Sequence, residues 1–466
     1  MNAPDFAQRR RQLCERVGAP VLLGNNATRA RNLPMNSVPF RADSSFLYFT
    51  GCTEPGAYAL IVDGQCTLFL HPPEPGDELW HGEVESLESR RQRHDVHAVK
   101  ALAELDAACE AFRGRLLSLA VPDLAVNQRL GGLTGKPLAY TGSPGPEPLV
   151  DAVIQLRRSR DAWELGEMRE AARIASVAHR AAMRATRVGG HEREVAALFD
   201  AVVAAQGATT SYHSIVTVRG EILHNPDYKN PLREGDLLLL DGGAETSSGY
   251  ASDVTRTWPV NGTFTSRQRD MYQLCLEANE HCIPMCTAGQ RYADIHWAAT
   301  RYLASGLRDL GLLRGEVDTL VESGAVGVFF PHGVGHLIGL DVHDLENFGD
   351  RPAYAQGRSR PKQFGARFLR LDLDLQADVV VTIEPGIYFV PAILHDASLR
   401  AEFAGMVDFT AAEAWLGFGG IRVEDDVRVR AAGEAPEVLT ADIPKSIADI
   451  EALVGSGPSA RERLSP

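Results

Sequence analysis

Residues 237–256 read LLLLDGGAETSSGYASDVTR, and this stretch decides the fold of the second half of the chain. The four leucines form a continuous apolar run that is typical of a buried strand, and the run ends at Asp241. The tetrapeptide TSSG (246–249) indicates a turn, and Asp253 lies twelve positions after Asp241. We therefore expect an antiparallel hairpin that brings the two carboxylates together.

Three further potential metal ligands lie in apolar or glycine-rich stretches. They are His336 in HGVGHLIGLDVHD (332–344), Glu384 in VVVTIEPGIYF (379–389) and Glu424 in GFGGIRVEDDV (417–427). A carboxylate after a buried strand is costly unless it meets a partner or a metal. Each residue alone keeps a structural alternative, such as a turn former, a packed histidine or a solvent-exposed strand end. Together, four carboxylates and one imidazole fit a site for two divalent ions.

The histidines form a second signal. His332 and His336 have the spacing of the helical HExxH signature, but Pro331 and several glycines surround them, which excludes that motif. His332, His336 and His343 lie within twelve residues, in a setting that indicates close approach of the backbone to a site.

Length, charge and cysteine usage narrow the class of protein. At 466 residues we expect two or three domains, and the net charge of -14 argues against a nucleic-acid partner. The N-terminus lacks the apolar segment of a signal peptide, and no apolar run is long enough for a membrane span, so we expect a cytoplasmic protein without a membrane partner. Seven cysteines without a CxxC pair suit a reducing compartment. We interpret Cys275, Cys282 and Cys286 as buried thiols rather than a soft-metal cluster.

The pattern predicts an α/β protein with two domains. In residues 1–150 we expect an opening helix and then a mixed sheet. Its strands are predicted in VLLGNN (21–26), FLYFTG (46–51), YALIVDG (58–64) and CTLFLHP (66–72). The segment TGSPGPEPLVD (141–151) concentrates proline and glycine and indicates the boundary with a second domain over 151–466.

The second domain is predicted to combine long helices with strands. We expect helices over residues 158–188, 192–205, 266–282 and 292–310, and strands within 214–218, 236–245, 250–260, 379–389 and 420–430. The C-terminal GSGPSARERLSP (455–466) is expected to be frayed.

In their order and setting, the five ligand stretches resemble the metallopeptidases of the pita-bread fold, peptidase family M24B, which includes prolidases and aminopeptidase P. FRADSSFLYFTGCTEPGAYALIV (40–62) resembles the domain that precedes the catalytic one in both enzymes. The resemblance implies such a domain at 1–150 and a pita-bread catalytic domain at 151–466. Because all five ligand types are present, we favour an enzyme over a catalytically inactive binding module.

The resemblance implies roles for the ligands. Asp241 would bind one ion and His336 and Glu384 the other, with Asp253 and Glu424 bridging the two. Such ions lower the pKa of a bridging water and polarise the scissile carbonyl, and Glu384 would act as general base and then acid. We expect Mn²⁺, with Co²⁺, Zn²⁺ or Fe²⁺ as alternatives.

Other residues match family positions around the substrate. His332, His343 and His224 match histidines that surround it, and Arg422 matches a residue that steadies a metal ligand. The matches to substrate-binding positions are Arg370, Tyr212 and Trp80. The tryptophan implies a homodimer, since in the family it reaches the neighbouring active site, although core or interface packing is the alternative.

The expected substrate is a small peptide with proline at its second position. Arg370, the PHGVGH motif (331–336) and the long connection from Phe389 to Gly417 resemble prolidase, so we expect hydrolysis of Xaa-Pro dipeptides. The alternatives are an Xaa-Pro aminopeptidase acting on longer peptides and a side activity on organophosphates.

Two departures from the family stand out. The spacing of Asp241 and Asp253 exceeds the usual one by one residue, which places an extra residue in the hairpin tip. The segment TTSYHSIVTVRGEILHN (209–225) is shorter than in prolidases, which leaves the positions of Tyr212 and His224 open.

Overall fold

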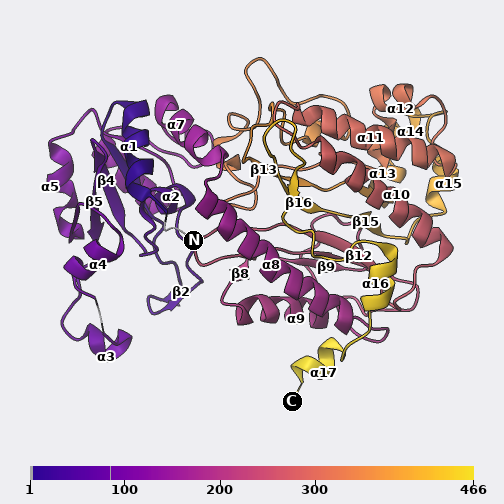
Figure 1. The fold of residues 1–466 in the computed structure, drawn as a ribbon, viewed down its shortest axis with the longest axis horizontal. Helices are drawn as coiled ribbons and strands as arrows, with labels where there is room; N and C mark the ends of the chain where they lie inside the picture. Colours follow the sequence, from indigo (N-terminus) through magenta and orange to yellow (C-terminus); the bar gives the residue numbers. More distant parts are fainter. Residues whose placement is uncertain (1–3, 84, 466) are drawn as a thin grey trace. The chain divides into compact units, whose positions relative to one another are not determined.

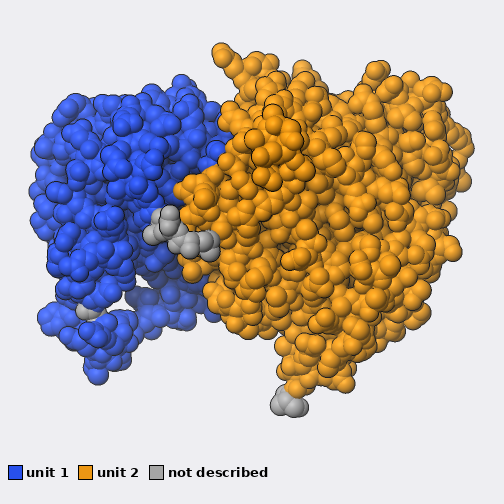
Figure 2. Space-filling view, in the orientation of Figure 1, with its two compact units in different colours: residues 1–159, 345–352 blue, residues 160–344, 353–466 orange. Residues whose placement is uncertain are grey.

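The computed structural model describes residues 4–83 and 85–465. The chain forms two compact units, unit 1 with residues 1–159 and 345–352, and unit 2 with residues 160–344 and 353–466 (Figure 2). Within the described residues, no helix combines the length and apolar character that crossing a membrane requires.

Unit 1 is built on a five-stranded sheet in the order β6-β5-β4-β1-β7. The strands are β1 (Val21–Gly24), β4 (Tyr58–Val62), β5 (Gln65–Leu70), β6 (Ala98–Ala101) and β7 (Leu117–Ser118). β1 pairs with β4 and β4 with β5 in antiparallel fashion, whereas β7 and β6 join in parallel, so the predicted mixed sheet is confirmed. A small exposed hairpin, β2 (Ala30–Leu33) and β3 (Asn36–Ser37), stands apart from this sheet.

Helices accompany the sheet of unit 1. They are α1 (Phe6–Val17), α2 (Ser44–Thr50), α3 (Asp77–His81), α4 (Leu87–Arg93), α5 (Leu105–Glu110), α6 (Leu124–Thr134) and α7 (Glu147–Arg158). The strand predicted for FLYFTG is wrong, because these residues lie in α2 and its cap. Asp43 caps this helix by accepting a hydrogen bond from Phe46 N at 2.9 Å, and Gly51 ends it at φ 61°. Every residue of α2 is buried, and periodicity cannot separate a fully buried helix from a strand.

Unit 2 contains the predicted hairpin. β10 (Leu237–Asp241) pairs antiparallel with β12 (Thr255–Pro259) on one side and with β9 (Ile215–Thr217) on the other. The tip turns at Thr246–Gly249, where Gly249 N donates to Thr246 O at 2.9 Å and Gly249 has φ 87°. β11 (Ala244–Glu245) within the connection pairs with β8 (Thr209–Thr210).

A second set of strands carries the later ligand stretches. β13 (Val380–Ile383) pairs with β16 (Asp425–Arg428), which also pairs with β17 (Glu437–Val438). β14 (Gly386–Tyr388) pairs with β15 (Gly420–Arg422). All of these pairings are antiparallel, and Glu384 and Glu424 fall between the two ladders.

Long helices pack around these strands, as Figure 1 shows. They are α8 (Ala162–Ala185), α9 (Glu192–Ala205), α10 (Ser266–Cys282) and α11 (Tyr292–Asp309), followed by shorter helices α12 (Val317–Ser323), α13 (Pro391–Leu394), α14 (Ala397–Glu402), α15 (Phe409–Glu413) and α16 (Ile447–Leu453). α8 packs on α9, and α10 packs on α11. The four long helices confirm the predicted ones.

The C-terminal segment is ordered rather than frayed, so that prediction is wrong. Residues Ala460–Leu464 form α17, which Ser459 caps and which packs on α9. Arg461 forms an ion pair with Glu194 at 2.8 Å, and the guanidinium of Arg187 donates to the Gly455 carbonyl at 2.6 Å. Contacts made with residues far away in sequence therefore override the polar composition of this tail.

Candidate metal centre

The hairpin presents its two aspartates to the same place. Asp241 is the last residue of β10, and Asp253 lies just before β12 begins. The phenol oxygen of Tyr212 lies within hydrogen-bonding distance of both carboxylates, at 2.5 Å from Asp253 Oδ1. Both aspartates are buried, which requires a compensating partner for each charge.

His336 faces these carboxylates with its Nε2 atom. Its Nδ1 lies 3.0 Å from the Leu337 carbonyl, which sets the ring orientation. Nε2 lies 3.4 Å from Asp253 Oδ2 and 3.6 Å from Glu384 Oε1. The loop that carries His336 packs closely on β13. A Cβ atom added at Gly335 would lie only 2.2 Å from the Thr382 carbonyl oxygen. Glycine is therefore required at this position.

Glu384 and Glu424 are the remaining two potential ligands. Glu384 lies between β13 and β14, and Glu424 lies between β15 and β16. Glu424 is 2% exposed, and its Oε2 accepts a hydrogen bond from Thr255 Oγ1 at 2.6 Å. Glu384 N donates to the Val334 carbonyl at 2.8 Å, which ties this glutamate to the histidine loop.

The five side chains and His343 form three overlapping groups, and within each group the potential ligand atoms lie within 4.8 Å of one another. These groups are Asp241 with Asp253 and Glu424, His336 with Glu384 and Glu424, and Asp253 with His336 and His343. Ligands that bind an octahedral ion at about 2.1 Å are about 3 Å apart, so the observed 3.4 to 3.6 Å spacings are close to those of a coordination shell. The donor set thus fits divalent metal ions.

Electrostatics also favours cations here. Burial, followed by the charges of Asp253 and Glu384, raises the pKa of Glu424 well above its ordinary value. Burial likewise raises the pKa of Asp241. Burial opposes the charged form of Asp253 as well, but the hydrogen bond from His336 holds its pKa below the ordinary value. Crowded buried carboxylates of this kind are stabilised by a positive ion.

Arg422 links the aspartates to the histidine side of the site. Its guanidinium forms an ion pair with Asp241 and donates to Thr255 Oγ1 at 2.8 Å and to the Tyr388 hydroxyl at 2.9 Å. That hydroxyl in turn lies 2.9 Å from His332 Nε2. A continuous polar chain therefore runs from Asp241 to His332.

The remaining residues that were predicted for unit 2 lie around this centre. The ring of His343 meets that of His336 edge to face, with centroids 4.4 Å apart. Burial lowers the pKa of His332 and of His343 to about 3. Burial also lowers the pKa of His224, and the charges of Arg422 and Arg370 act in the same direction. Arg370 is half-buried, and its charge acts with burial in lowering the pKa values of His332 and His343. At Glu384 burial raises the pKa, and the charge of Arg370 opposes this.

Trp80 belongs to unit 1. It lies on α3 and is 68% exposed, so it is not a core residue of this chain. Cys275, Cys282 and Cys286 are buried, and none of them belongs to a potential metal-binding group within residues 4–83 and 85–465.

One more group of potential ligands, Cys52, Glu54 and His94, lies in unit 1. Arg90 and Arg93 pair with Glu54 at 3.2 and 2.8 Å, so guanidinium groups already supply the positive charge. This group is an ion-pair cluster.

Residues 166–431 match the metallopeptidase family M24, and residues 6–116 match the N-terminal domain of aminopeptidase P. The chain belongs to metallopeptidase family M24. The predicted architecture, an N-terminal domain followed by an M24 catalytic domain of the pita-bread fold, is confirmed. The M24 family brings with it a dinuclear metal centre, and the residues that could hold it are those described above.

Named relatives of this M24 chain fall into two groups. A probable Xaa-Pro aminopeptidase, pepP, of Aspergillus clavatus is 31% identical, over 95% of this chain and 96% of the relative. The Xaa-Pro dipeptidase of Homo sapiens is 32% identical, over 96% of this chain and 92% of the relative.

Solved M24 structures share the fold over the whole chain. Aminopeptidase PepP of Pseudomonas aeruginosa is similar with a TM-score of 0.80 and 28% identity, covering 99% of both chains. Aminopeptidase P of E. coli with the inhibitor Pro-Leu gives a TM-score of 0.78 and 27% identity, covering 98% of both chains.

Sequence reasoning missed the hydroxyl groups that hydrogen-bond to the candidate ligands and to Arg422. Thr255 touches Glu424 and Arg422, and Tyr388 lies between Arg422 and His332. A signal for Tyr388 was present, because a residue four positions after Glu384 in an extended segment lies on the same face. No comparable local signal marks Thr255.

Proposed function

We propose that this chain is a dinuclear-metal exopeptidase that hydrolyses the Xaa-Pro bond of dipeptides. Relatives named Xaa-Pro aminopeptidase and Xaa-Pro dipeptidase support the preference for proline. Proline makes the scissile bond a tertiary amide with a fixed φ, so a site shaped for it is chemically reasonable.

The metal centre would hold two ions. Asp241 would hold one ion, His336 and Glu384 would hold the other, and Asp253 and Glu424 would be shared between them. The overlapping groups support this assignment, since Glu424 belongs to two of them and Asp253 contacts both Tyr212 and His336. One histidine with four carboxylates suits Mn²⁺, with Co²⁺, Zn²⁺ and Fe²⁺ as alternatives.

When bound, the two ions polarise the scissile carbonyl and lower the pKa of water towards neutrality. Glu384 accepts the proton of the attacking water and delivers it to the proline nitrogen as that group leaves.

Around the reacting carbonyl, His332, His343 and His224 orient the substrate and stabilise the charge of the tetrahedral intermediate. The pKa of about 3 at His332 and His343 keeps both imidazoles neutral. His332 donates its one N–H to the Gly333 carbonyl at 2.7 Å, which fixes its ring, whereas His343 can donate one N–H to the substrate without adding charge. Arg422 holds Asp241 in place through an ion pair. Tyr212 would contact the substrate.

The position of Arg370 carries the dipeptidase proposal. Its charge contributes to lowering the pKa values of His332 and His343, which supports a guanidinium near these two histidines. A free carboxylate directly after proline can accept a bidentate hydrogen bond from it, whereas an extended peptide has no carboxylate there.

An Xaa-Pro aminopeptidase acting on longer peptides is the second candidate, favoured by the fungal relatives and by the solved aminopeptidase P structures. An inactive binding module is less favoured, because all five ligand side chains converge. Attack of the same activated water on organophosphates would be a side reaction.

We further propose a homodimer in which Trp80 of one subunit reaches the neighbouring substrate site. Its 68% exposure supports a role outside the core of its own chain. Residues 1–150 would serve this assembly, and residues 151–466 would carry catalysis. A cytoplasmic location and small peptides as partners, without nucleic acid, agree with the net charge of -14 and the free cysteines.

The deciding experiment compares Ala-Pro with Ala-Pro-Ala as substrates of the Mn²⁺-loaded protein. We expect rapid cleavage of the dipeptide and little cleavage of the tripeptide. Cleavage of the tripeptide alone would establish the aminopeptidase instead. A folded protein that takes up none of the four metals and cleaves neither peptide would support the binding module.

A further inference from the structure

A buried amide reaches the two breaks in strand pairing where the glutamates lie. Asn279, on α10, is fully buried, and its Nδ2 donates to the carbonyls of Ile383 at 2.8 Å and Val423 at 3.3 Å. These carbonyls directly precede Glu384 and Glu424. One side chain therefore ties together the two backbone segments that carry both glutamate ligands.

Glu384 and Glu424 are not themselves members of the two strand ladders. The ladder of β13 and β16 ends at Ile383 opposite Asp425, and the ladder of β14 and β15 ends at Gly386 opposite Arg422. The amide of Asn279 donates to the carbonyl at the end of the first ladder and to the one just before Glu424, so it joins the two segments across the break.

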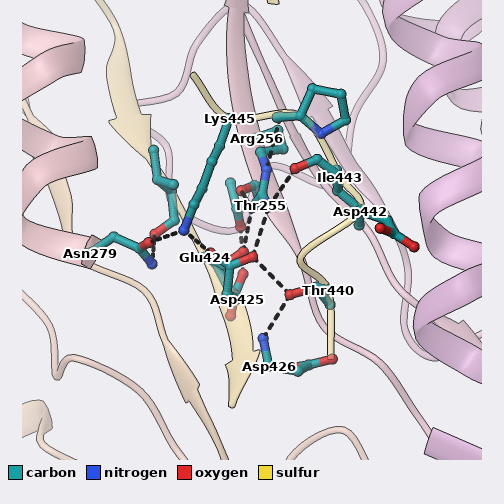
Figure 3. A network of polar contacts seen from close by, with 12 residues as sticks. Thr255, Arg256, Asn279, Glu424, Asp425, Asp426, Thr440, Asp442, Ile443 and Lys445 are labelled. Atoms are coloured by element: carbon teal, nitrogen blue, oxygen red, sulfur yellow. Dashed lines mark hydrogen bonds and ion pairs between the residues drawn. The ribbon is translucent and has the colours of Figure 1, made fainter. Parts of the chain in front are cut away.

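A chain of charged groups orients this amide. Its Oδ1 accepts from Lys445 Nζ at 2.8 Å, and the same ammonium pairs with Asp425 Oδ2 at 2.8 Å (Figure 3). Because the oxygen faces the ammonium, the NH₂ group must face the two carbonyls.

This series of charged groups ends at the backbone of Glu424. Asp425 Oδ1 accepts from Arg256 at 2.7 Å, and Arg256 donates to the Glu424 carbonyl at 2.5 Å (Figure 3). The side chains of Arg256 and Asp425 are both fully buried, so removing either one would leave an uncompensated buried charge.

We infer that Asn279 is a positioning residue that sets the separation between Glu384 and Glu424, with Lys445 holding its amide in register. This inference rests on the proposed metal-dependent function, because the separation matters only where the two glutamates share ions. A fixed separation pre-forms the coordination shell, so no binding free energy is spent on ordering it.

The test compares Asn279→Ala with Asn127→Ala. Asn127 in unit 1 is also buried, and its side chain likewise bridges backbone groups, at 2.7 and 2.8 Å to Val121. Both variants lose a buried amide, so both should lower the melting temperature of the metal-free protein. Mn²⁺ affinity is measured by titration calorimetry, and the site geometry by the absorption spectrum of the Co²⁺-loaded protein.

We expect Asn279→Ala to weaken at least one of the two Mn²⁺ equivalents by about tenfold or more and to change the Co²⁺ spectrum. Asn127→Ala should leave both as in the wild type. Wild-type affinity and spectrum in Asn279→Ala would overturn the inference. If the wild type itself bound no metal, the proposed function would fail instead.

A second variant covers failure of Asn279→Ala to fold. Asn279→Asp keeps the volume and the contact with Lys445, but it places an oxygen against the Ile383 and Val423 carbonyls. We expect the same loss of Mn²⁺ affinity, and unchanged affinity in this variant would equally overturn the inference.

Discussion

Thr255 and Glu424 are joined by two hydrogen bonds. The Thr255 hydroxyl donates to Glu424 Oε2 at 2.6 Å, and Glu424 N donates to the Thr255 carbonyl at 3.1 Å. The same hydroxyl accepts from Arg422 Nε at 2.8 Å. A single threonine on the hairpin strand therefore orients a glutamate from the other set of strands.

Replacing this hydroxyl should damage the metal centre more than the fold. In Thr255→Val the shape is kept, but Glu424 and Arg422 each lose a partner, so we expect a loss of about 10- to 100-fold in metal affinity or kcat. Thr255→Ser keeps the hydroxyl and serves as the matched control. Activity of Thr255→Val equal to that of the wild type would contradict this role.

Neutralising either carboxylate that is proposed to be shared by the two ions should abolish activity. We expect Asp253→Asn and Glu424→Gln each to lose at least one metal equivalent, measured by elemental analysis after dialysis. Their circular dichroism should remain that of the wild type, because removing one of several crowded charges does not disturb packing. Full activity in either variant would contradict the bridging assignment.

Arg370→Ala should discriminate between substrates. Loss of a hydrogen bond to a charged group is worth about 1.5 to 3 kcal/mol, so we expect kcat/KM for Ala-Pro to fall by about tenfold or more, mainly through KM. Arg367→Ala removes an exposed arginine that stacks on Phe364 and Phe368 and is the control. Unchanged Ala-Pro kinetics in Arg370→Ala would contradict the proposed contact between Arg370 and the free carboxylate.

His296 should make the fold sensitive to acid. It lies on α11 beside Trp297 and Phe330, and burial lowers its pKa from 6.5 to about 4. The folded state therefore resists protonation, and the stability present above pH 6.5 is lost as the pH falls towards 4. One pKa unit is worth about 1.4 kcal/mol, so this loss amounts to about 3 kcal/mol.

Urea unfolding of His296→Phe between pH 7.5 and 4 measures this contribution. We expect the variant to lose less stability than the wild type over this range, whereas His395→Phe, at an exposed histidine, should follow the wild type. Parallel curves for His296→Phe and the wild type would show that His296 does not contribute.

Local signals explain the elements that could be predicted. α9 and α10 were predicted with the observed bounds, and Thr265 and Gln268 cap α10 with a reciprocal pair of hydrogen bonds. The hairpin of β10 and β12 followed from one apolar run, a turn and a second strand. The sequence also placed five potential ligands in order, because each lies beside an apolar strand or a glycine.

Partners that depend on the assembled fold could not be predicted. Asn279 meets carbonyls more than one hundred residues away in sequence, and Thr255 meets Glu424 across two sheets. The same limit explains both wrong elements, since the fully buried α2 lacks a periodic pattern and α17 is ordered by Arg461 and Glu194.

The hairpin that joins Asp241 to Asp253 turns at Thr246–Gly249. The number of residues between the two aspartates can therefore change without changing how far apart they lie in space. The strands stay in register up to the pairing of Asp241 with Thr255, so a residue added at the tip leaves both carboxylates at Tyr212. A search pattern that demands one fixed interval between these aspartates would therefore overlook chains like this one. Recognition should instead anchor on the strand ends and let the loop length vary.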